Sequence, residues 1–166
     1  MEIETTRFGH VEIDEKLIIT LPQGILGFED FKRYCILDHI DKESPFKWLQ
    51  SVDDPSLAFV ITDPLIFLSH YKAKVPVQEV ADIKLSDAAQ AIIAVIVNIK
   101  RDHSEITMNL QGPLVINSHE RLAKQVIIRD GEYSVRHVIF SATAGECCDA
   151  QPSASEHREA IKPNCL

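Results

Sequence analysis

The sequence predicts an all-β protein, mainly antiparallel, whose strands form a small barrel or a sandwich. Short runs rich in β-branched and aromatic residues recur along residues 1–140, and turn-forming residues separate them at short intervals. Long helical patterns do not alternate with these runs, as they would in a doubly wound α/β fold. We therefore expect about nine or ten strands, with one or two short helical turns and no internal repeat.

The N-terminal half supplies the first strands. Extended segments are expected, in order, over residues 2–7, 11–13, 16–21, 34–40, 46–51 and 57–62. The last two flank Asp53-Asp54-Pro55-Ser56, a favourable turn sequence, and should form a hairpin. Between the third and fourth lies a loop, Leu21–Phe28, in which Pro22 and two glycines interrupt strand pairing.

The C-terminal half is less uniform. Residues 66–71 fit a strand or a single helical turn, residues 77–80 fit a short strand, and Ser86 can cap a short helix that reaches Gln90. Further strands are expected over residues 92–100, 106–110, 114–117 and 125–129, and then a tight turn at Asp130-Gly131 and an edge strand at 133–135.

Composition changes near Ser141. Residues 141–166 are small, polar and proline-containing, which predicts a flexible tail after a single β domain over residues 1–140. The net charge is −8, of which −6 lies on residues 1–140. An acidic protein is suited to a basic partner and argues against nucleic-acid binding, although solubility alone also explains the charge.

Sequence signatures of enzymes are missing. The chain contains no GxGxxG, Walker, GxSxG or HExxH motif. Asp53-Asp54 is interpreted as part of a turn, and the seven histidines show no metal-binding spacing. Cys147, Cys148, His157 and Cys165 are too irregularly spaced for a zinc site. We expect no catalytic activity, no metal and no cofactor.

The N-terminus and the apolar runs indicate where in the cell the protein is located. The longest apolar run, Ala91–Val97, is far shorter than the roughly 20 residues that span a bilayer. Residues 1–13 are acidic and alternating, unlike a signal peptide. The sequence therefore predicts a cytoplasmic protein that does not bind membranes.

One loop and one strand carry candidate binding residues. In the loop, Gly24 and Gly27 precede Phe28 and Glu29. This glycine pair does not open a helix, so a phosphate-binding loop is disfavoured. A turn that presents an aromatic ring and an acid suits recognition, and a plain structural loop is the alternative. Trp48 is interpreted either as core or as the anchor of a binding patch.

Three segments together resemble the flagellar assembly factor FliW family. Leu21-Pro-Gln-Gly-Ile-Leu-Gly-Phe-Glu29 resembles the family's FPxGLLGFE stretch. The segments 45–51, 53–55 and 57–60 resemble its PFxWLQS…DDPxLAFVV block, and 107–110, 113–117 and 125–127 resemble its TxNLxAPIVIN…QVIL block. The similarity covers about residues 1–140, with mild departures such as Gly112 in place of Ala.

This resemblance implies a non-enzymatic protein with two protein partners. One is flagellin, held before export, and the other is the translational regulator CsrA, whose repression of flagellin mRNA is relieved by partner exchange without direct nucleic-acid binding. Position in the motifs makes the following residues candidates for partner binding: Gly24, Gly27, Phe28, Glu29, Trp48, Gln50, Asn109 and Asn117. The alternative is an enzyme or small-ligand binder whose barrel mouth forms a pocket.

Overall fold

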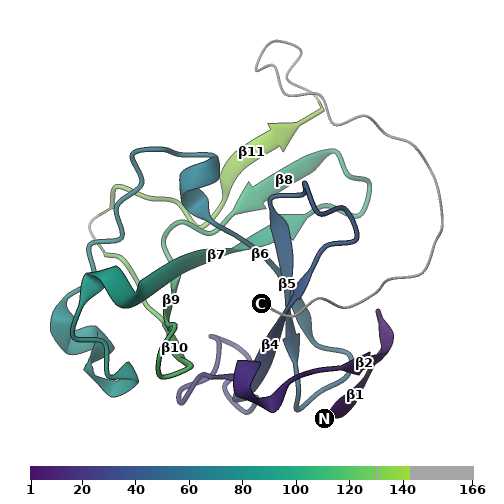
Figure 1. Cartoon of the computed structure of the whole chain (residues 1–166). Helices are drawn as coiled ribbons and strands as arrows, with labels where there is room; N and C mark the ends of the chain where they lie inside the picture. Colours follow the sequence, from purple (N-terminus) through teal and green to yellow (C-terminus); the bar gives the residue numbers. More distant parts are fainter. Residues whose placement is uncertain (130, 143–166) are drawn as a thin grey trace.

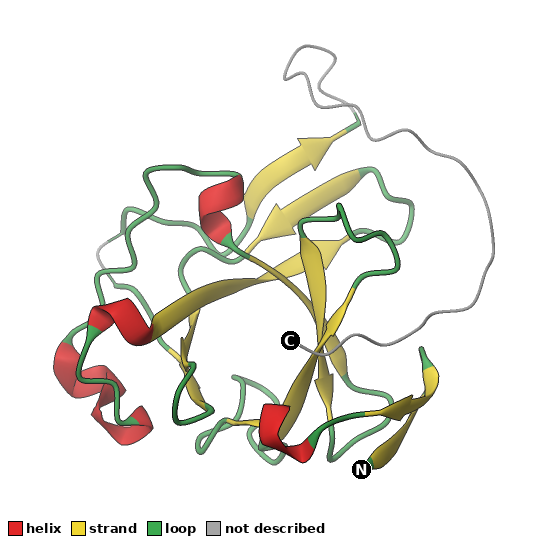
Figure 2. Cartoon of the chain, viewed as in Figure 1, coloured by secondary structure: helices red, strands yellow, loops and turns green. Residues whose placement is uncertain are grey.

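The computed structural model describes residues 1–129 and 131–142, and it confirms the all-β prediction (Figures 1 and 2). The strands are β1 (Glu2–Thr5), β2 (Gly9–Glu12), β3 (Ile19–Thr20), β4 (Arg33–Asp38), β5 (Phe46–Ser51), β6 (Ala58–Thr62), β7 (Ala91–Ile99), β8 (Glu105–Met108), β9 (Leu114–Asn117), β10 (Leu122–Gln125) and β11 (His137–Ser141). Four short 3₁₀ helices accompany the described strands, where one or two helical turns were expected: η1 (Glu15–Leu17), η2 (Pro64–Ile66), η3 (Val77–Ile83) and η4 (Ala88–Gln90).

The main sheet closes on itself. Its strand order is β11-β8-β7-β6-β5-β4-β3-β10-β9, and β9 also pairs with β7. Closure depends on the nine-residue β7, which pairs with β9 through 91–94, with β6 through 95–97 and with β8 through 97–99. The pairings are antiparallel except between β3 and β10. The architecture is therefore a small barrel, extended on one side by β8 and β11 (Figure 1).

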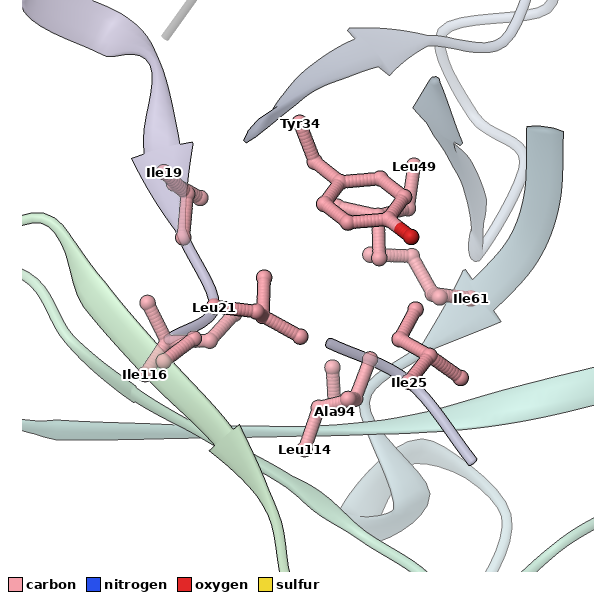
Figure 3. Packing of buried hydrophobic residues seen from close by; sticks show 10 residues of the cluster. Ile19, Leu21, Ile25, Tyr34, Leu49, Ile61, Ala94, Leu114 and Ile116 are labelled. Atoms are coloured by element: carbon pink, nitrogen blue, oxygen red, sulfur yellow. The ribbon is translucent and has the colours of Figure 1, made fainter. Parts of the chain in front are cut away.

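Apolar side chains fill the barrel interior. Residues from β3, β4, β5, β6, β7 and β9 converge there, and Tyr34, Leu49 and Ile61 are among them (Figure 3). The segment that joins β3 to β4 also enters this core, because Leu21 and Ile25 are buried in it. We call residues 21–31 the plug loop. Burial of two large aliphatic side chains, at about 1.5–3 kcal/mol each, makes this loop part of the core.

The hairpin of β1 and β2 covers the outside of the barrel. Alternation along β5 turns Leu49 into the interior and Trp48 outward. Ile3, Val11 and Ile13 of the hairpin region pack with Trp48 over the outer faces of β4 and β5. Leu49 and Trp48, on opposite faces of β5, therefore belong to two different apolar clusters.

Several local predictions are wrong, three of them in the C-terminal half; in the N-terminal half, the strand expected over 16–21 is reduced to β3, because η1 includes its first two residues. Residues 77–80 begin the 3₁₀ helix η3 and do not form a strand, because Pro76 precedes it and Val80 and Ile83, three positions apart, bury the same face. The last barrel strand is β10 at 122–125, three residues before the expected one, because the tight turn after β9 starts pairing at Leu122. The edge strand is β11, after the expected 133–135.

Two further expectations fall on parts of the chain without a described structure. The expected tail is outside the described residues from position 143 onward, and so is Asp130 of the expected Asp130-Gly131 turn. In the described part of the chain, no helix is both long enough and apolar enough to cross a membrane.

Candidate functional site

The plug loop is built from two consecutive turns. The backbone N–H of Gly24 donates to the carbonyl of Leu21 at 2.9 Å, and that of Phe28 donates to the carbonyl of Ile25 at 2.7 Å. Gly24 and Gly27 have positive φ angles of 72° and 83°, which favour glycine. These turns place Ile25 in the core and leave the loop tip at the surface.

The two glycines of the loop have different surroundings. A Cβ on Gly24 would lie 2.7 Å from the Cα of Glu29 and 2.9 Å from the carbonyl oxygen of Phe28. At Gly27 a Cβ would meet nothing within 4 Å. Gly24 therefore permits a close approach between two parts of the backbone, whereas Gly27 supplies only a positive φ angle.

Glu29 fixes the tip of the loop. Its Oε1 accepts a hydrogen bond from the backbone N–H of Gly27 at 2.8 Å. This bond, with smaller contributions from its own backbone N–H and from Lys32, lowers the pKa of the Glu29 carboxyl group below its ordinary value. The side chain remains exposed, so it is a negative charge at the edge of the loop surface.

Exposed apolar side chains occupy the same tip. Leu26 is 57% exposed and Phe28 is 39% exposed. The Phe28 ring packs edge-on against Phe59 of β6, with the ring centroids 5.1 Å apart, so it rests on the barrel core. We call Leu26 and Phe28 the plug-loop patch. A rigid, partly exposed aromatic beside an exposed leucine is typical of a contact surface for another protein.

The side-chain amide of Gln125 connects the plug-loop patch to the C-terminal half of the barrel. Gln125 accepts a hydrogen bond from the backbone N–H of Leu26 at 3.0 Å and donates one to the carbonyl of Gly112 at 3.1 Å. The N–H of Gly112 in turn donates to the Oδ1 of Asn109 at 2.9 Å. Ile127, two positions beyond Gln125, is also an exposed apolar residue.

Sequence reasoning did not select Gln125 as a site residue. Its position at the start of the Gln125–Ile127 motif was the available signal, but only the fold brings it to Leu26, which lies 99 positions away. The structure does bring together Gly24, Gly27, Phe28 and Glu29, and it connects Asn109 to them through Gly112 and Gln125.

Trp48 lies in a different place, on the outer face of β5. It is partly buried, its ring packs edge-on against Phe8 at 5.5 Å between centroids, and the Arg7 guanidinium lies 4.4 Å from the ring centroid. Both contacts come from the turn between β1 and β2. Trp48 therefore attaches the hairpin to the barrel and remains partly exposed.

Gln50 and Asn117 are buried. The Nε2 of Gln50 lies within 3.0–3.4 Å of four backbone carbonyl oxygens in residues 51–57, so it holds the turn between β5 and β6. Asn117 donates to the carbonyls of Ile83 and Lys84 and accepts from the N–H groups of His119 and Glu120. In this conformation neither side chain offers surface to a partner.

The Asp53-Asp54 pair forms the predicted turn. Asp53 accepts hydrogen bonds from the backbone N–H groups of Lys32 and Arg33, and Asp54 accepts two from Ser56. The Ser56 bonds lower the pKa of Asp54 below its ordinary value. Among the described residues, no group of three or more His, Cys, Asp or Glu side chains is placed to hold a metal ion.

Negative charge gathers on the outer face of the β1–β2 hairpin. Glu2 lies directly opposite Glu12, and Glu4 lies opposite His10. All four side chains are exposed, and His10, at 3.7 Å from Glu2, offers a partly compensating charge when protonated. This face is distinct from the plug-loop patch, because it covers the outside of β4 and β5.

The fold and the site define a class: a small closed β-barrel whose core includes two side chains of its own loop and whose loop tip presents an apolar patch. Residues 2–139 match the family model described as FliW protein. The chain is 39% identical to the flagellar assembly factor FliW of Leptospira interrogans, over 88% of this chain and 97% of that protein. It is 37% identical to the flagellar assembly factor FliW of Geobacter sulfurreducens, over 93% of this chain and 96% of that protein.

A solved structure supports the same family assignment. The crystal structure of the flagellar assembly factor FliW superposes with a TM-score of 0.77 at 33% identity, over 87% of this chain and all of that one. The chain belongs to the FliW family. The resemblance found in the sequence motifs is thereby confirmed.

Proposed function

We propose that this protein is a cytoplasmic flagellar assembly factor that binds flagellin and CsrA and relieves CsrA repression of flagellin mRNA by partner exchange. It acts by protein binding alone, with no catalysis and no direct contact with nucleic acid. The observation that carries the proposal is membership of the FliW family, whose curated relatives from several bacteria are named flagellar assembly factors.

The plug-loop patch supports a site for flagellin. An apolar helical face needs exposed apolar side chains on a rigid support, and Leu26 and Phe28 provide both. Gly24, Gly27 and Glu29 shape the loop that carries them. Asn109 contributes through the hydrogen-bonded connection to Gln125, so five of the candidate residues act at one surface in this proposal.

The acidic face of the β1–β2 hairpin supports a separate site for CsrA. An RNA-binding protein carries basic surface, and Glu2, Glu4 and Glu12 offer complementary charge. Trp48 holds the hairpin on the barrel, so its part in this proposal is to support that face. For partner exchange, binding at one of these surfaces must weaken binding at the other, so the proposal includes coupling between them.

The small-ligand alternative receives less support. A ligand in the barrel mouth needs interior space, and in the described structure Leu21 and Ile25 of the plug loop pack there against Ala94 and Leu114 (Figure 3). Opening such a pocket would require removal of two buried aliphatic side chains from the core.

Binding measurements on the purified full chain test the flagellin site. Leu26→Ala and Phe28→Ala should each weaken flagellin binding about tenfold, as truncation of interface anchors does, and leave CsrA binding unchanged. Leu65→Ala and Phe140→Ala remove the same groups at other exposed positions and serve as matched controls. Equal loss in patch and control variants would contradict the assignment, and wild-type protein that binds neither partner would overturn the proposed function.

The CsrA site has its own test. The double change Glu2→Gln with Glu12→Gln should weaken CsrA binding several-fold at low salt and much less at about 0.5 M salt, because screening removes the attraction. Glu43→Gln with Glu79→Gln removes the same charge from exposed positions elsewhere. If both pairs of changes have the same effect, total charge and not the hairpin face determines binding.

A further inference from the structure

In the described part of the chain, the tip of the plug loop has one hydrogen bond to residues outside the loop. Within residues 25–29, Gly27 and Phe28 donate to atoms of the loop itself. Only the N–H of Leu26 donates outside the loop, to the Oε1 of Gln125, among the hydrogen bonds of the described residues. The apolar contacts of Ile25 and Phe28 anchor the loop to the core, but they do not specify the orientation of the Leu26 backbone.

Gln125 is itself held in place. Its Nε2 donates to the carbonyl of Gly112, whose N–H is bound by Asn109. Gly112 is packed closely against both amides: a Cβ there would lie 2.9 Å from the Nδ2 of Asn109 and 3.1 Å from the Nε2 of Gln125. Because the amide is fixed at its nitrogen end, its oxygen end has a defined position from which to bind Leu26.

The chemistry of the contact requires an amide. One end of the side chain must accept from an N–H group, and the other must donate to a carbonyl oxygen. A carboxylate at this position would place negative charge against the carbonyl of Gly112. An apolar side chain of equal size would leave both the Leu26 N–H and the Gly112 carbonyl without this partner.

We infer that Gln125 is a positioning residue that fixes the backbone of Leu26 and thereby sets the presentation of the plug-loop patch to its protein partner. The effect on the partner rests on the proposed function, whereas the effect on the loop does not. Gln125 acts on the partner through the plug-loop patch. Its removal should therefore alter the conformation of the loop more than the stability of the barrel.

Hydrogen exchange in the free protein tests the loop directly. Gln125→Met, which keeps the side-chain volume, should raise exchange at the Leu26 amide about tenfold, the effect of losing one hydrogen bond. Exchange in residues 46–51 of β5 should rise less than at Leu26, and the urea midpoint of unfolding should fall only by what a loss of about 1 kcal/mol produces. If exchange rises equally in β5, Gln125 is a general stabilising residue and the inference is overturned. Unchanged exchange at Leu26 also overturns it.

A pH profile separates positioning from a plain structural role. Gln125→Glu should weaken flagellin binding about fivefold near pH 8, relative to wild type at the same pH. As the pH falls toward about 5, the introduced carboxyl group takes up a proton, which the neighbouring Gly112 carbonyl favours, and can donate as the amide did. Affinity should therefore return toward wild type for Gln125→Glu and stay low at every pH for Gln125→Met.

Gln78→Glu makes the same chemical change at an exposed position and should match wild type throughout. A Gln125→Glu profile parallel to that of Gln78→Glu overturns the inference. If Leu26 exchange responds as expected and wild-type protein binds neither flagellin nor CsrA, the positioning role holds and the proposed function fails. The two conclusions are thus tested by separate measurements.

Discussion

Asp53 receives two hydrogen bonds from Arg33, one from the backbone N–H at 2.9 Å and one from Nε at 2.7 Å. A third comes from the backbone N–H of Lys32 at 3.0 Å. Because Lys32 and Arg33 lead from the plug loop into β4, Asp53 connects the end of that loop to the turn between β5 and β6. A surface turn thus fixes the end of the loop whose residues Leu21 and Ile25 are buried in the barrel core.

Replacement of Asp53 should make stability depend less on pH. Partial burial raises the pKa of Asp53, but the bonds from Arg33 and Lys32 outweigh burial, so its pKa lies below the ordinary 3.8. The depressed pKa means that Asp53 stabilises the folded state above about pH 4 and that this contribution is lost as pH falls through the folded-state pKa.

We expect Asp53→Asn to lower the free energy of unfolding by about 1–2 kcal/mol at pH 7, and the difference from wild type to shrink below about pH 4. Urea titrations at several pH values measure this. Asp30→Asn, an exposed change in the same loop, should have little effect. A difference that stays constant down to pH 3 would show that charge at Asp53 is unimportant.

Asn117 should be more important for stability than its polarity suggests. Its buried amide holds the end of η3 and the turn after β9 through four backbone groups. Asn117→Ala leaves buried backbone groups without partners and should cost about 2–3 kcal/mol in unfolding free energy. Asn98→Ala, at an exposed position of β7, should change it by less than about 0.5 kcal/mol. Similar costs for the two changes would contradict this role.

Tyr34 should tolerate loss of its hydroxyl group. Its side chain is fully buried in the barrel interior, and its hydroxyl oxygen has no hydrogen-bond partner among the described residues (Figure 3). Tyr34→Phe should therefore leave the unfolding free energy unchanged or raise it by about 1 kcal/mol. A loss above about 1 kcal/mol in thermal or urea unfolding would indicate that the hydroxyl group is satisfied in solution.

Tyr34 should also make the stability of the protein depend on pH in the alkaline range. Burial, and to a lesser degree Asp53, raises the pKa of Tyr34 from 10.0 to about 12. The neutral phenol therefore contributes stability that is fully present below pH 10.0 and is lost as pH rises toward about 12. Tyr34→Phe should lose stability less steeply over this range, measured by urea titrations between pH 9 and 11.

The two loop glycines should respond unequally to substitution. Gly24→Ala places a Cβ against the backbone of Glu29 at a positive φ angle and should cost about 3 kcal/mol or more in unfolding free energy. Gly27→Ala meets open space and should cost only about 1 kcal/mol, for its φ angle. Equal costs, measured by urea unfolding, would mean that the contact with Glu29 relaxes easily.

Local pattern predicted the strands but not every boundary. Phe46–Ser51 and Leu114–Asn117 form strands with the predicted ends, because their β-branched and aromatic residues are bounded by turn sequences. Residues 77–80 contain two β-branched valines and nevertheless begin a 3₁₀ helix, because burial of Val80 and Ile83 against β9 and β10 outweighs β propensity there.

The candidate site residues also fall into two groups, those whose role the sequence motif indicated and those whose role depends on the fold. The motif of glycine, aromatic and acidic residues correctly indicated a shaped loop, since positive φ angles and a local hydrogen bond depend on neighbouring residues. The motif positions of Gln50 and Asn117 could not reveal that both side chains are buried. Their roles depend on which carbonyl groups the fold brings to them.

The sequence by itself therefore determined that this protein is all-β, acidic and similar to the FliW family, because alternation, charge and motif order are properties of the chain. Only the tertiary structure decided that the sheet closes into a barrel and that Leu21 and Ile25 are buried in its core. Only the structure brings Gln125 to Leu26, because that contact joins residues 99 positions apart through register and packing that no local pattern encodes.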